Sequence, residues 1–218
     1  MAEIRVVDDP AGAVAALLDA TDGHVVLAGG SSPRRAYEKC GGDWSRKTLW
    51  FGDERCVGPE HEWSNYRMAR GALLHRIQAA AKHRIEGELG AAEAADRYDE
   101  LIREQLGDEP VFDLVLLGLG PDSHVASLFP GKPALDERDR RAVAVPEAGM
   151  EPHVPRVTLT FPALNAARAL VLLVTGVDKA PAVARAFGAA ARPDPAVPAS
   201  LLRDPIVYLD AAAAADLG

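Results

Sequence analysis

The sequence predicts an α/β fold in which a mostly parallel β-sheet is covered by helices. Short apolar runs alternate with segments of helical periodicity, an order that is typical of such a sheet. The run at 114–117 is apolar at every position, as expected of a strand that is buried on both faces. With 218 residues, of which 48% are hydrophobic, the chain can bury a sizeable core. We therefore expect residues 1–218 to form a single domain.

The predicted elements follow from local patterns. Strands are expected at 25–28, 49–51, 114–117, 143–145, 157–159, 170–174 and 206–209, and helices at 34–39, 64–77 and 91–106. Pro33 suits a first helical turn, Ser64 can act as an N-cap, and Gly107 ends the third helix. The alanine-rich stretch at 211–215 has a helix-forming composition. The Pro-rich segment 192–198 is expected to be a loop.

Composition limits the partners and the compartment. The formal net charge of −8 argues against nucleic acid or an acidic membrane surface, because both require a basic face. Cys40 and Cys56 have no metal-type spacing and fit a reducing compartment. The N-terminus lacks a basic and then apolar leader, and no apolar run approaches the length of a membrane span. These observations predict a cytoplasmic protein.

The loop at 29–32 follows the first predicted strand and precedes a helix. Gly29 and Gly30 allow a ligand to approach the backbone, and the helix start offers unpaired N–H groups and the positive end of its dipole. Ser31 and Ser32 add hydroxyl donors. We interpret this loop as a cradle for a phosphate, the alternative being an ordinary strand-to-helix turn. The pattern matches neither a P-loop nor a dinucleotide fingerprint.

A second polar loop, Asp53-Glu54-Arg55, follows the strand at 49–51. The Arg55 guanidinium is suited to a carboxylate, a phosphate or an oxyanion, and Asp53 and Glu54 are candidates for orienting it. The alternative is a surface ion cluster of little energetic consequence. Because the carboxyl ends of parallel strands meet at one edge of a sheet, we expect Arg55 to lie near the loop at 29–32.

The candidate for proton chemistry is His124, which follows the buried run at 114–117 and the glycines Gly118 and Gly120. An imidazole can act as a general base at neutral pH, and Asp122 is close enough to orient it. The alternative is a histidine that caps a helix or is satisfied in the core. A metal site is not expected because the other histidines lack ligand spacing, and a serine triad is not expected because Gly-x-Ser-x-Gly is absent.

Two further cations stand at the ends of predicted strands. Arg156 opens the strand at 157–159. Lys179 lies where a helix begins, a position that is unfavourable for a cation unless an anion is near. Such a local inconsistency is typical of functional sites, although a solvated lysine on a loop is the alternative.

Taken together, these residues carry a resemblance to a known family. The chain resembles the 6-phosphogluconolactonases, within the glucosamine-6-phosphate isomerase/deaminase superfamily. The matching segments occur in family order and run nearly from end to end. They are Gly-Gly-Ser-Ser-Pro at 29–33, Phe-Gly-Asp-Glu-Arg at 51–55, Ser-Asn-Tyr-Arg-Met at 64–68, the whole of 112–131, Arg-Val-Thr-Leu-Thr at 156–160, Gly-Val-Asp-Lys-Ala at 176–180 and Pro-Ala-Ser-Leu-Leu at 198–202.

The resemblance implies a three-layer, Rossmann-like fold of the glucosamine-6-phosphate deaminase type. It implies hydrolysis of 6-phospho-D-glucono-1,5-lactone to 6-phosphogluconate in the oxidative pentose phosphate pathway, without a metal or organic cofactor. The partner is then a small phosphorylated sugar lactone, and the protein a monomer or small homo-oligomer. The family's catalytic histidine corresponds to His124, with Arg55 as the expected oxyanion partner. Its substrate-binding positions fall on the loop Gly29, Gly30, Ser31 and Ser32, on Arg55, on Arg156 and on Lys179.

The chain departs from the family pattern at the catalytic loop. Asp-Ser-His-Val at 122–125 replaces the usual Asp-Gly-His-Thr. If the glycine takes a positive φ, Ser123 costs about 1 kcal/mol or more there. Two other functions stay open. A sugar-phosphate isomerase or deaminase needs further acid–base groups, and 125–129 offers no carboxylate. A non-catalytic sugar-phosphate sensor is normally joined to a DNA-binding segment, for which the chain has no basic stretch.

Overall fold

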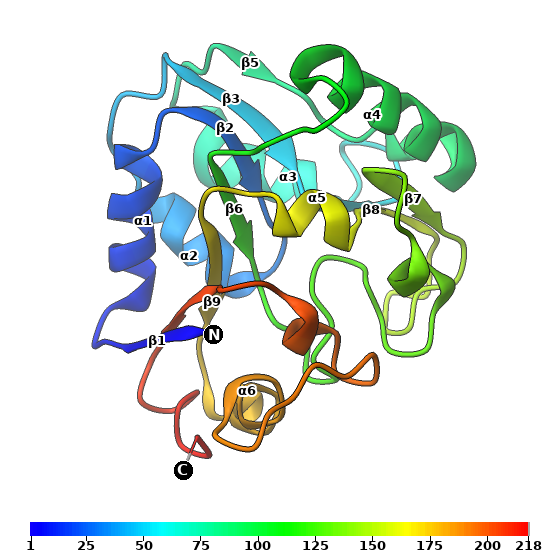
Figure 1. Cartoon of the computed structure of the whole chain (residues 1–218). Helices are drawn as coiled ribbons and strands as arrows, with labels where there is room; N and C mark the ends of the chain where they lie inside the picture. The colour runs from blue at the N-terminus through cyan, green and yellow to red at the C-terminus, as the bar shows by residue number, and fades with distance from the viewer. Residues whose placement is uncertain (218) are drawn as a thin grey trace.

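A seven-stranded, fully parallel sheet organises the structure (Figure 1), a computed structural model that describes residues 1–217. Its strand order is β1-β10-β9-β6-β2-β3-β5. The strands are β1 (Glu3–Val6), β2 (Gly23–Leu27), β3 (Lys47–Phe51), β5 (Ala81–Lys82), β6 (Leu114–Leu117), β9 (Leu170–Val174) and β10 (Ile206–Leu209). The central strands β6 and β9 are buried at every residue, which explains their continuous apolar sequence.

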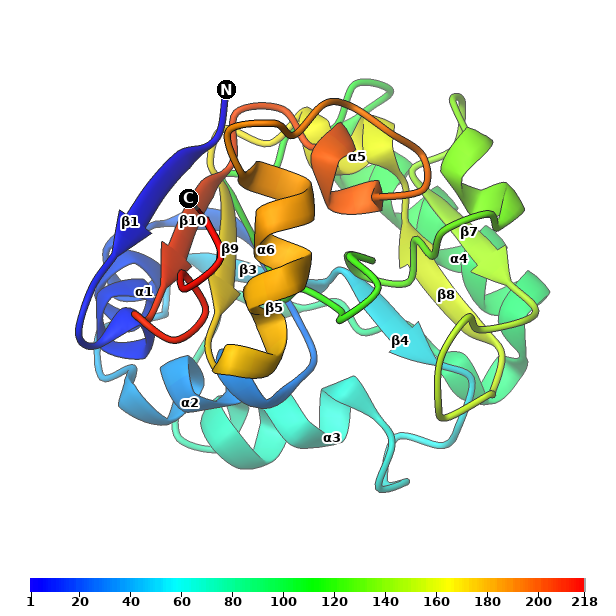
Figure 2. The ribbon, with the colours of Figure 1, turned by 90° about the horizontal axis from the view of Figure 1, so that it is seen from below.

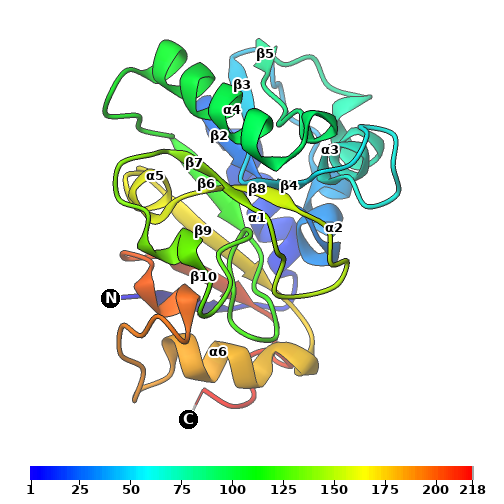
Figure 3. The same cartoon turned by 90° about the vertical axis from the view of Figure 1, so that its right-hand side faces the viewer.

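Helices cover both faces of this sheet, and a second sheet lies beside it (Figure 3). Helices α1 (Pro10–Ala20) and α2 (Ser31–Lys39) lie on one side, and α4 (Ala91–Leu106) and α5 (Phe161–Asn165) on the other. The remaining helices are α3 (Asn65–Ala69) and α6 (Ala180–Phe187). The layers give the α/β arrangement that the sequence predicts. None of the helices in residues 1–217 combines the length and apolar character needed to cross a membrane.

The small sheet is antiparallel and has the order β4-β8-β7, with β4 at Asp53–Arg55, β7 at Ala142–Val145 and β8 at Arg156–Leu159. Helix α4 packs against it. Gly52 joins the two sheets, because its N–H donates to Leu27 O at 2.9 Å and its carbonyl accepts from Leu159 N at 2.8 Å. The chain thus passes from β3 directly into β4, which holds Arg55 beside the main sheet.

Most predicted elements are confirmed, and the structure contains several further elements that the sequence patterns did not predict. The bounds of β6, β9, β10 and α4 agree with it, and Ser64 Oγ accepts from Arg67 N as an N-cap. Strands β1, β4 and β5 and helix α1 were not predicted, since the strands are short or carry polar residues.

Two predicted helices are wrong in part. The helix expected at 64–77 is α-helical only to Ala69, and a π-helical turn at Arg70–Leu74 follows. The alanine-rich stretch at 211–215 forms turns. Its Ala213 is buried and donates its N–H to Asp210 Oδ1, whereas its neighbours are largely exposed. Alanine propensity alone does not sustain a helix that has no apolar face to bury.

The sheet topology leaves a crevice beside β6. The chain runs from β2 outward to β3 and β5, and then returns to place β6 on the other side of β2. Loops that leave β2 and β6 therefore diverge, which is the arrangement that binds ligands at the carboxyl edge of open α/β sheets. The loops at 28–32, 118–124 and 175–179 all emerge at this edge, as the view from below shows (Figure 2).

Candidate active site

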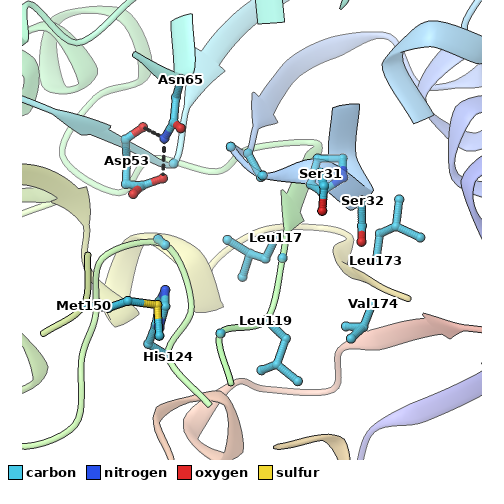
Figure 4. A pocket seen from close by; sticks show the side chains of 18 of the residues that line it. Ser31, Ser32, Asp53, Asn65, Leu117, Leu119, His124, Met150, Leu173 and Val174 are labelled. Atoms are coloured by element: carbon cyan, nitrogen blue, oxygen red, sulfur yellow. Dashed lines mark hydrogen bonds between the residues drawn. The ribbon is translucent and has the colours of Figure 1, made fainter. Parts of the chain in front are cut away.

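One pocket of about 200 Å³ lies at this edge, and every residue predicted for the site lines it. These residues are Gly29, Gly30, Ser31, Ser32, Arg55, His124, Arg156 and Lys179. Figure 4 shows the serines on one side of the pocket and His124 on the other, with Leu117 and Leu119 drawn between them and Leu173 and Val174 beside Ser32. The loops that follow strands of the main sheet therefore meet at one edge, and the small antiparallel sheet brings Arg156 to the same pocket.

The Gly29–Ser32 loop presents backbone donors to the pocket. Gly30 has a φ of +100° and occupies the N-cap of α2. No capping side chain accepts from the first N–H groups of the helix within residues 1–217. The Ser32 hydroxyl lies 2.7 Å from Thr175 Oγ1, which ties this loop to the end of β9. A side chain at Gly29 would overlap the Asn65 amide. The loop thus has the features of an anion site.

The imidazole of His124 is held by its neighbour in the same loop. His124 Nδ1 lies 2.6 Å from Asp122 Oδ1, and the side chain is only 14% exposed. Because a carboxylate accepts the Nδ1 proton, Nε2 of the neutral ring carries the lone pair that a base requires. Burial raises the pKa of Asp122, but its hydrogen bond to His124 and the charge of that ring outweigh burial and lower the pKa overall.

The catalytic-loop backbone is strained at the residue before His124. Ser123 has a φ of +69° and is fully buried. Its carbonyl accepts from Ala199 N at 3.0 Å, so the segment at 198–202 supports the loop. Gly120 lies so close to the imidazole that a Cβ there would overlap His124. The positive φ expected of the family glycine is therefore present in this chain with serine.

Asp53 and Glu54 were candidates for orienting Arg55, but within residues 1–217 neither carboxylate bonds to its guanidinium, and of Arg55 only the backbone N–H donates to Glu54. Arg55 Nη1 donates to the Trp63 carbonyl at 2.6 Å, and the buried Nε has no hydrogen-bond partner among residues 1–217. Glu54 instead accepts from the backbone N–H groups of Asn65 and Tyr66 at the start of α3. Burial raises the pKa of Glu54 despite these bonds. Arg55 also lines the pocket, so its guanidinium is a candidate partner for a bound ligand.

Asp53 forms a separate polar group in the pocket wall. Its Oδ1 accepts from Asn65 Nδ2 at 3.0 Å, drawn in Figure 4, and its Oδ2 accepts from Ser127 Oγ at 2.6 Å. Asp53 is 7% exposed. Sequence reasoning missed Ser127 because 74 positions separate it from Asp53, and no local pattern links the two.

Arg156 and Lys179 line the pocket together with Arg55 and add two further cations to it. Arg156 is 3% exposed and its Nη2 donates to the carbonyls of Met150 and Pro152, while its buried Nε lacks a partner within the described chain. Burial lowers the pKa of this guanidinium, and the Asp53 charge opposes the effect. Lys179 is the residue before α6, and its Nζ lies 3.9 Å from the Asp178 carboxylate.

Other groups offer little nucleophilic or metal-binding chemistry. Burial raises the pKa of the Cys56 thiol to about 11 and that of Cys40 to about 12, so neither forms a thiolate readily at neutral pH. Within residues 1–217, His, Cys, Asp and Glu side chains form no group of three or more arranged to hold a metal ion. His124, the Gly29–Ser32 loop and the cations of the pocket are thus the candidate reactive groups.

Comparison with known proteins finds sequences that are similar to this chain over most of its length. A family model described as glucosamine-6-phosphate isomerases/6-phosphogluconolactonase matches residues 6–207. A 6-phosphogluconolactonase from Nostoc sp. is 36% identical over 206 residues, which cover 88% of this chain and 84% of that protein. One from Homo sapiens is 42% identical over 145 residues, or 65% of this chain and 56% of the relative.

Solved structures extend the comparison to the fold. The 6-phosphogluconolactonase from Trypanosoma cruzi has a TM-score of 0.84 at 27% identity, with 100% of this chain and 97% of that one covered. A monomeric glucosamine-6-phosphate deaminase has a TM-score of 0.84 at 19% identity and covers 98% and 99% of the two chains. At that identity the second likeness concerns the fold alone, and it confirms the predicted deaminase-like architecture.

Proposed function

Because the chain belongs to the family of glucosamine-6-phosphate isomerases and 6-phosphogluconolactonases, we propose that it hydrolyses 6-phospho-D-glucono-1,5-lactone to 6-phosphogluconate. This is the lactonase step of the oxidative pentose phosphate pathway. The observation that carries the proposal is the Asp122–His124 pair facing a helix-terminal anion cradle in the same pocket. A base and a phosphate site at opposite sides of one pocket suit a phosphorylated lactone.

Binding begins at the phosphate. The N–H groups at the start of α2 and the Ser31 and Ser32 hydroxyls bind its oxygens, and Lys179 supplies a positive charge. Arg156 lies in the same pocket and adds a second cation. Fixing the phosphate in this way orients the sugar ring so that its lactone carbonyl lies near His124.

Hydrolysis then proceeds by general base catalysis. His124 Nε2 takes a proton from water, and the water oxygen forms a bond to the lactone carbonyl carbon. The guanidinium of Arg55, a residue that lines the pocket, donates to the tetrahedral oxyanion, as can backbone N–H groups. When the intermediate collapses, the bond from the carbonyl carbon to the ring oxygen breaks. The imidazolium of His124 returns its proton to that oxygen.

The composition bears on the compartment and the partner of the enzyme. A net charge of −8 and two free cysteines support a cytoplasmic enzyme whose partner is a small phosphorylated molecule. The family match over residues 6–207 supports one catalytic domain for the whole of 1–218. We propose that the enzyme works without a metal or organic cofactor, as a monomer or small homo-oligomer.

One observation favours a second candidate. Asp53 places a buried carboxylate in the pocket wall, and deaminase or isomerase chemistry needs an acid–base group in addition to the histidine. Both oxygens of Asp53 already accept hydrogen bonds, from Asn65 and Ser127, which favours a supporting role for this carboxylate. Release of ammonia from glucosamine 6-phosphate measures the alternative activity directly.

The experiment that tests the proposed function is lactone hydrolysis measured against the spontaneous background. Purified protein is expected to accelerate the reaction, and His124→Ala is expected to lose on the order of 10²–10⁴ in kcat while keeping its melting temperature within a few degrees. Thermal stabilisation by 6-phosphogluconate without any turnover of the lactone would favour the sensor function. Near-wild-type kcat in a folded His124→Ala variant would remove His124 as the base.

A further inference from the structure

The imidazole of His124 contacts an aromatic ring that the proposed mechanism does not use. The ring centroids of His124 and Phe129 are 4.5 Å apart at an interplanar angle of 42°, within the range of favourable aromatic pairs. The Arg156 guanidinium carbon lies 5.1 Å from the centroid of the same ring. Phe129 is fully buried. One phenyl ring therefore packs against both the candidate base and a candidate substrate-binding cation.

A glycine in the loop between β7 and β8 limits where this ring can lie. A Cβ added to Gly149 would be 2.9 Å from Cγ of Phe129 and 3.0 Å from its Cβ and Cδ1 atoms, closer than real contacts allow. Gly149 itself is exposed, and its φ is not in the positive range, so its backbone accepts other residues. The next residue, Met150, lines the pocket and accepts from Arg156 Nη2 at 3.0 Å.

We propose that Phe129 is a positioning residue for His124, and that Gly149 sets the place of the Phe129 ring from the loop at 146–155. This inference rests on the proposed function for its kinetic consequences. The hydrogen bond to Asp122 holds one atom of the imidazole and leaves the ring free to tilt about it. Contact with the Phe129 ring restricts that tilt and so directs Nε2 at the bound lactone.

The first test replaces the ring. In Phe129→Leu the site stays apolar but loses the flat surface against His124. We expect kcat to fall about ten- to hundredfold while KM for the lactone changes less than about twofold. The reason is that a misdirected base slows the chemical step more than it weakens binding of the phosphate. Phe112→Leu is the matched control. Phe112 is equally buried but packs against Trp50, away from the pocket, so its loss should lower the melting temperature and spare kcat.

The second test moves the ring without removing it. Gly149→Ala introduces one methyl group against Phe129 on an exposed loop and is expected to lower kcat about tenfold. Gly41→Ala is its control, because Gly41 is exposed and a Cβ there would meet nothing within 4 Å. In the Phe129→Leu background, Gly149→Ala should lower kcat much less, since the ring that it displaces is gone. Equal kcat in Gly149→Ala and Gly41→Ala, or additive losses in the double variant, would overturn the proposal.

A spectroscopic measurement separates this inference from the proposed function. Nitrogen-15 shifts of the His124 ring report its tautomer and hydrogen bonding without any substrate. We expect Phe129→Leu and Gly149→Ala to change these shifts, and Phe112→Leu and Gly41→Ala to leave them as in the wild type. If the wild-type protein fails to hydrolyse the lactone, the proposed function fails, but this measurement still decides whether Phe129 positions the imidazole. Unchanged shifts in both Phe129→Leu and Gly149→Ala would reject the positioning role of Phe129.

Discussion

Asp122 Oδ1 accepts two hydrogen bonds from His124, one from Nδ1 at 2.6 Å and one from the backbone N–H at 3.1 Å. A single oxygen thus fixes both the main chain and the side chain of the candidate base. The tautomer that results has its proton on Nδ1, which leaves Nε2 to accept a proton from water. The pair is local in sequence, so its geometry depends on the loop that carries it.

Asp122→Asn tests this relationship. We expect kcat to fall on the order of 10²–10⁴, since an amide no longer selects the tautomer by accepting the Nδ1 proton as a carboxylate does. Unchanged kcat over pH 5–9 would show that Asp122 does not orient the base.

The same pair predicts a pH dependence of stability. The folded-state pKa of Asp122 lies below its ordinary value, because the interactions with His124 outweigh burial. The carboxylate therefore contributes stability at pH values above its unfolded pKa, and this contribution is lost as the pH falls through the folded pKa. In urea titrations, the difference in unfolding free energy between wild type and Asp122→Asn should narrow as the pH is lowered from 6 toward 3. A difference that stays constant over this range contradicts the linkage.

Lys179→Ala is expected to act through affinity. Lys179 precedes α6, where the helix dipole disfavours a cation unless an anion is bound, and its nearest carboxylate partner, Asp178, is at the long distance of 3.9 Å. We expect KM for the phosphorylated lactone to rise about tenfold or more, with a smaller change in kcat. A non-phosphorylated gluconolactone is the control substrate, for which the variant and wild type should differ little. An unchanged kcat/KM for the phosphorylated lactone rejects the phosphate role.

Ser123→Gly should be tolerated. A φ of +69° costs a non-glycine residue roughly 1–2 kcal/mol, which glycine avoids, while the added freedom of the unfolded chain costs roughly 0.5–1 kcal/mol. Within residues 1–217, the Ser123 hydroxyl makes two long contacts, at 3.5 Å to the Ala182 carbonyl and 3.4 Å to Arg185. We expect a melting temperature equal to or slightly above that of the wild type, and kcat retained or raised. Ser123→Ala, which keeps the strain, should be the less stable variant, and a large drop in both quantities for Ser123→Gly would assign the hydroxyl a supporting role.

Activity should survive exhaustive chelation. The donor groups in residues 1–217 form no cluster suited to a metal ion, and the proposed base acts without one. The measurement is lactonase activity before and after dialysis against EDTA, with His124→Ala as the inactive reference. Loss of activity that zinc or magnesium restores would contradict the mechanism.

Local sequence patterns were sufficient to predict the helices and strands that depend on a few neighbouring residues. The apolar run Leu114–Leu117 and the helix Ala91–Leu106 with its terminal Gly107 agree with prediction, because periodicity and capping act over a few residues. Most pocket residues were also predictable, since they follow strands of the main sheet and parallel strands bring their carboxyl ends to one edge. Arg156 is different, because it opens a strand of the small antiparallel sheet. The family motifs, which occur in order along the chain, indicated the same pocket residues.

Only the tertiary structure decided how these residues are held. It pairs Asp53 with Ser127, directs Glu54 to the start of α3, buries Arg55 Nε without a partner in residues 1–217, and places Gly149 against Phe129 and so against His124. These contacts join segments that are distant in the chain, and no local pattern records which of them meet. Their partners depend on how the small antiparallel sheet and its connecting loop pack beside the main sheet, and packing of that kind is settled by the shapes of many side chains at once.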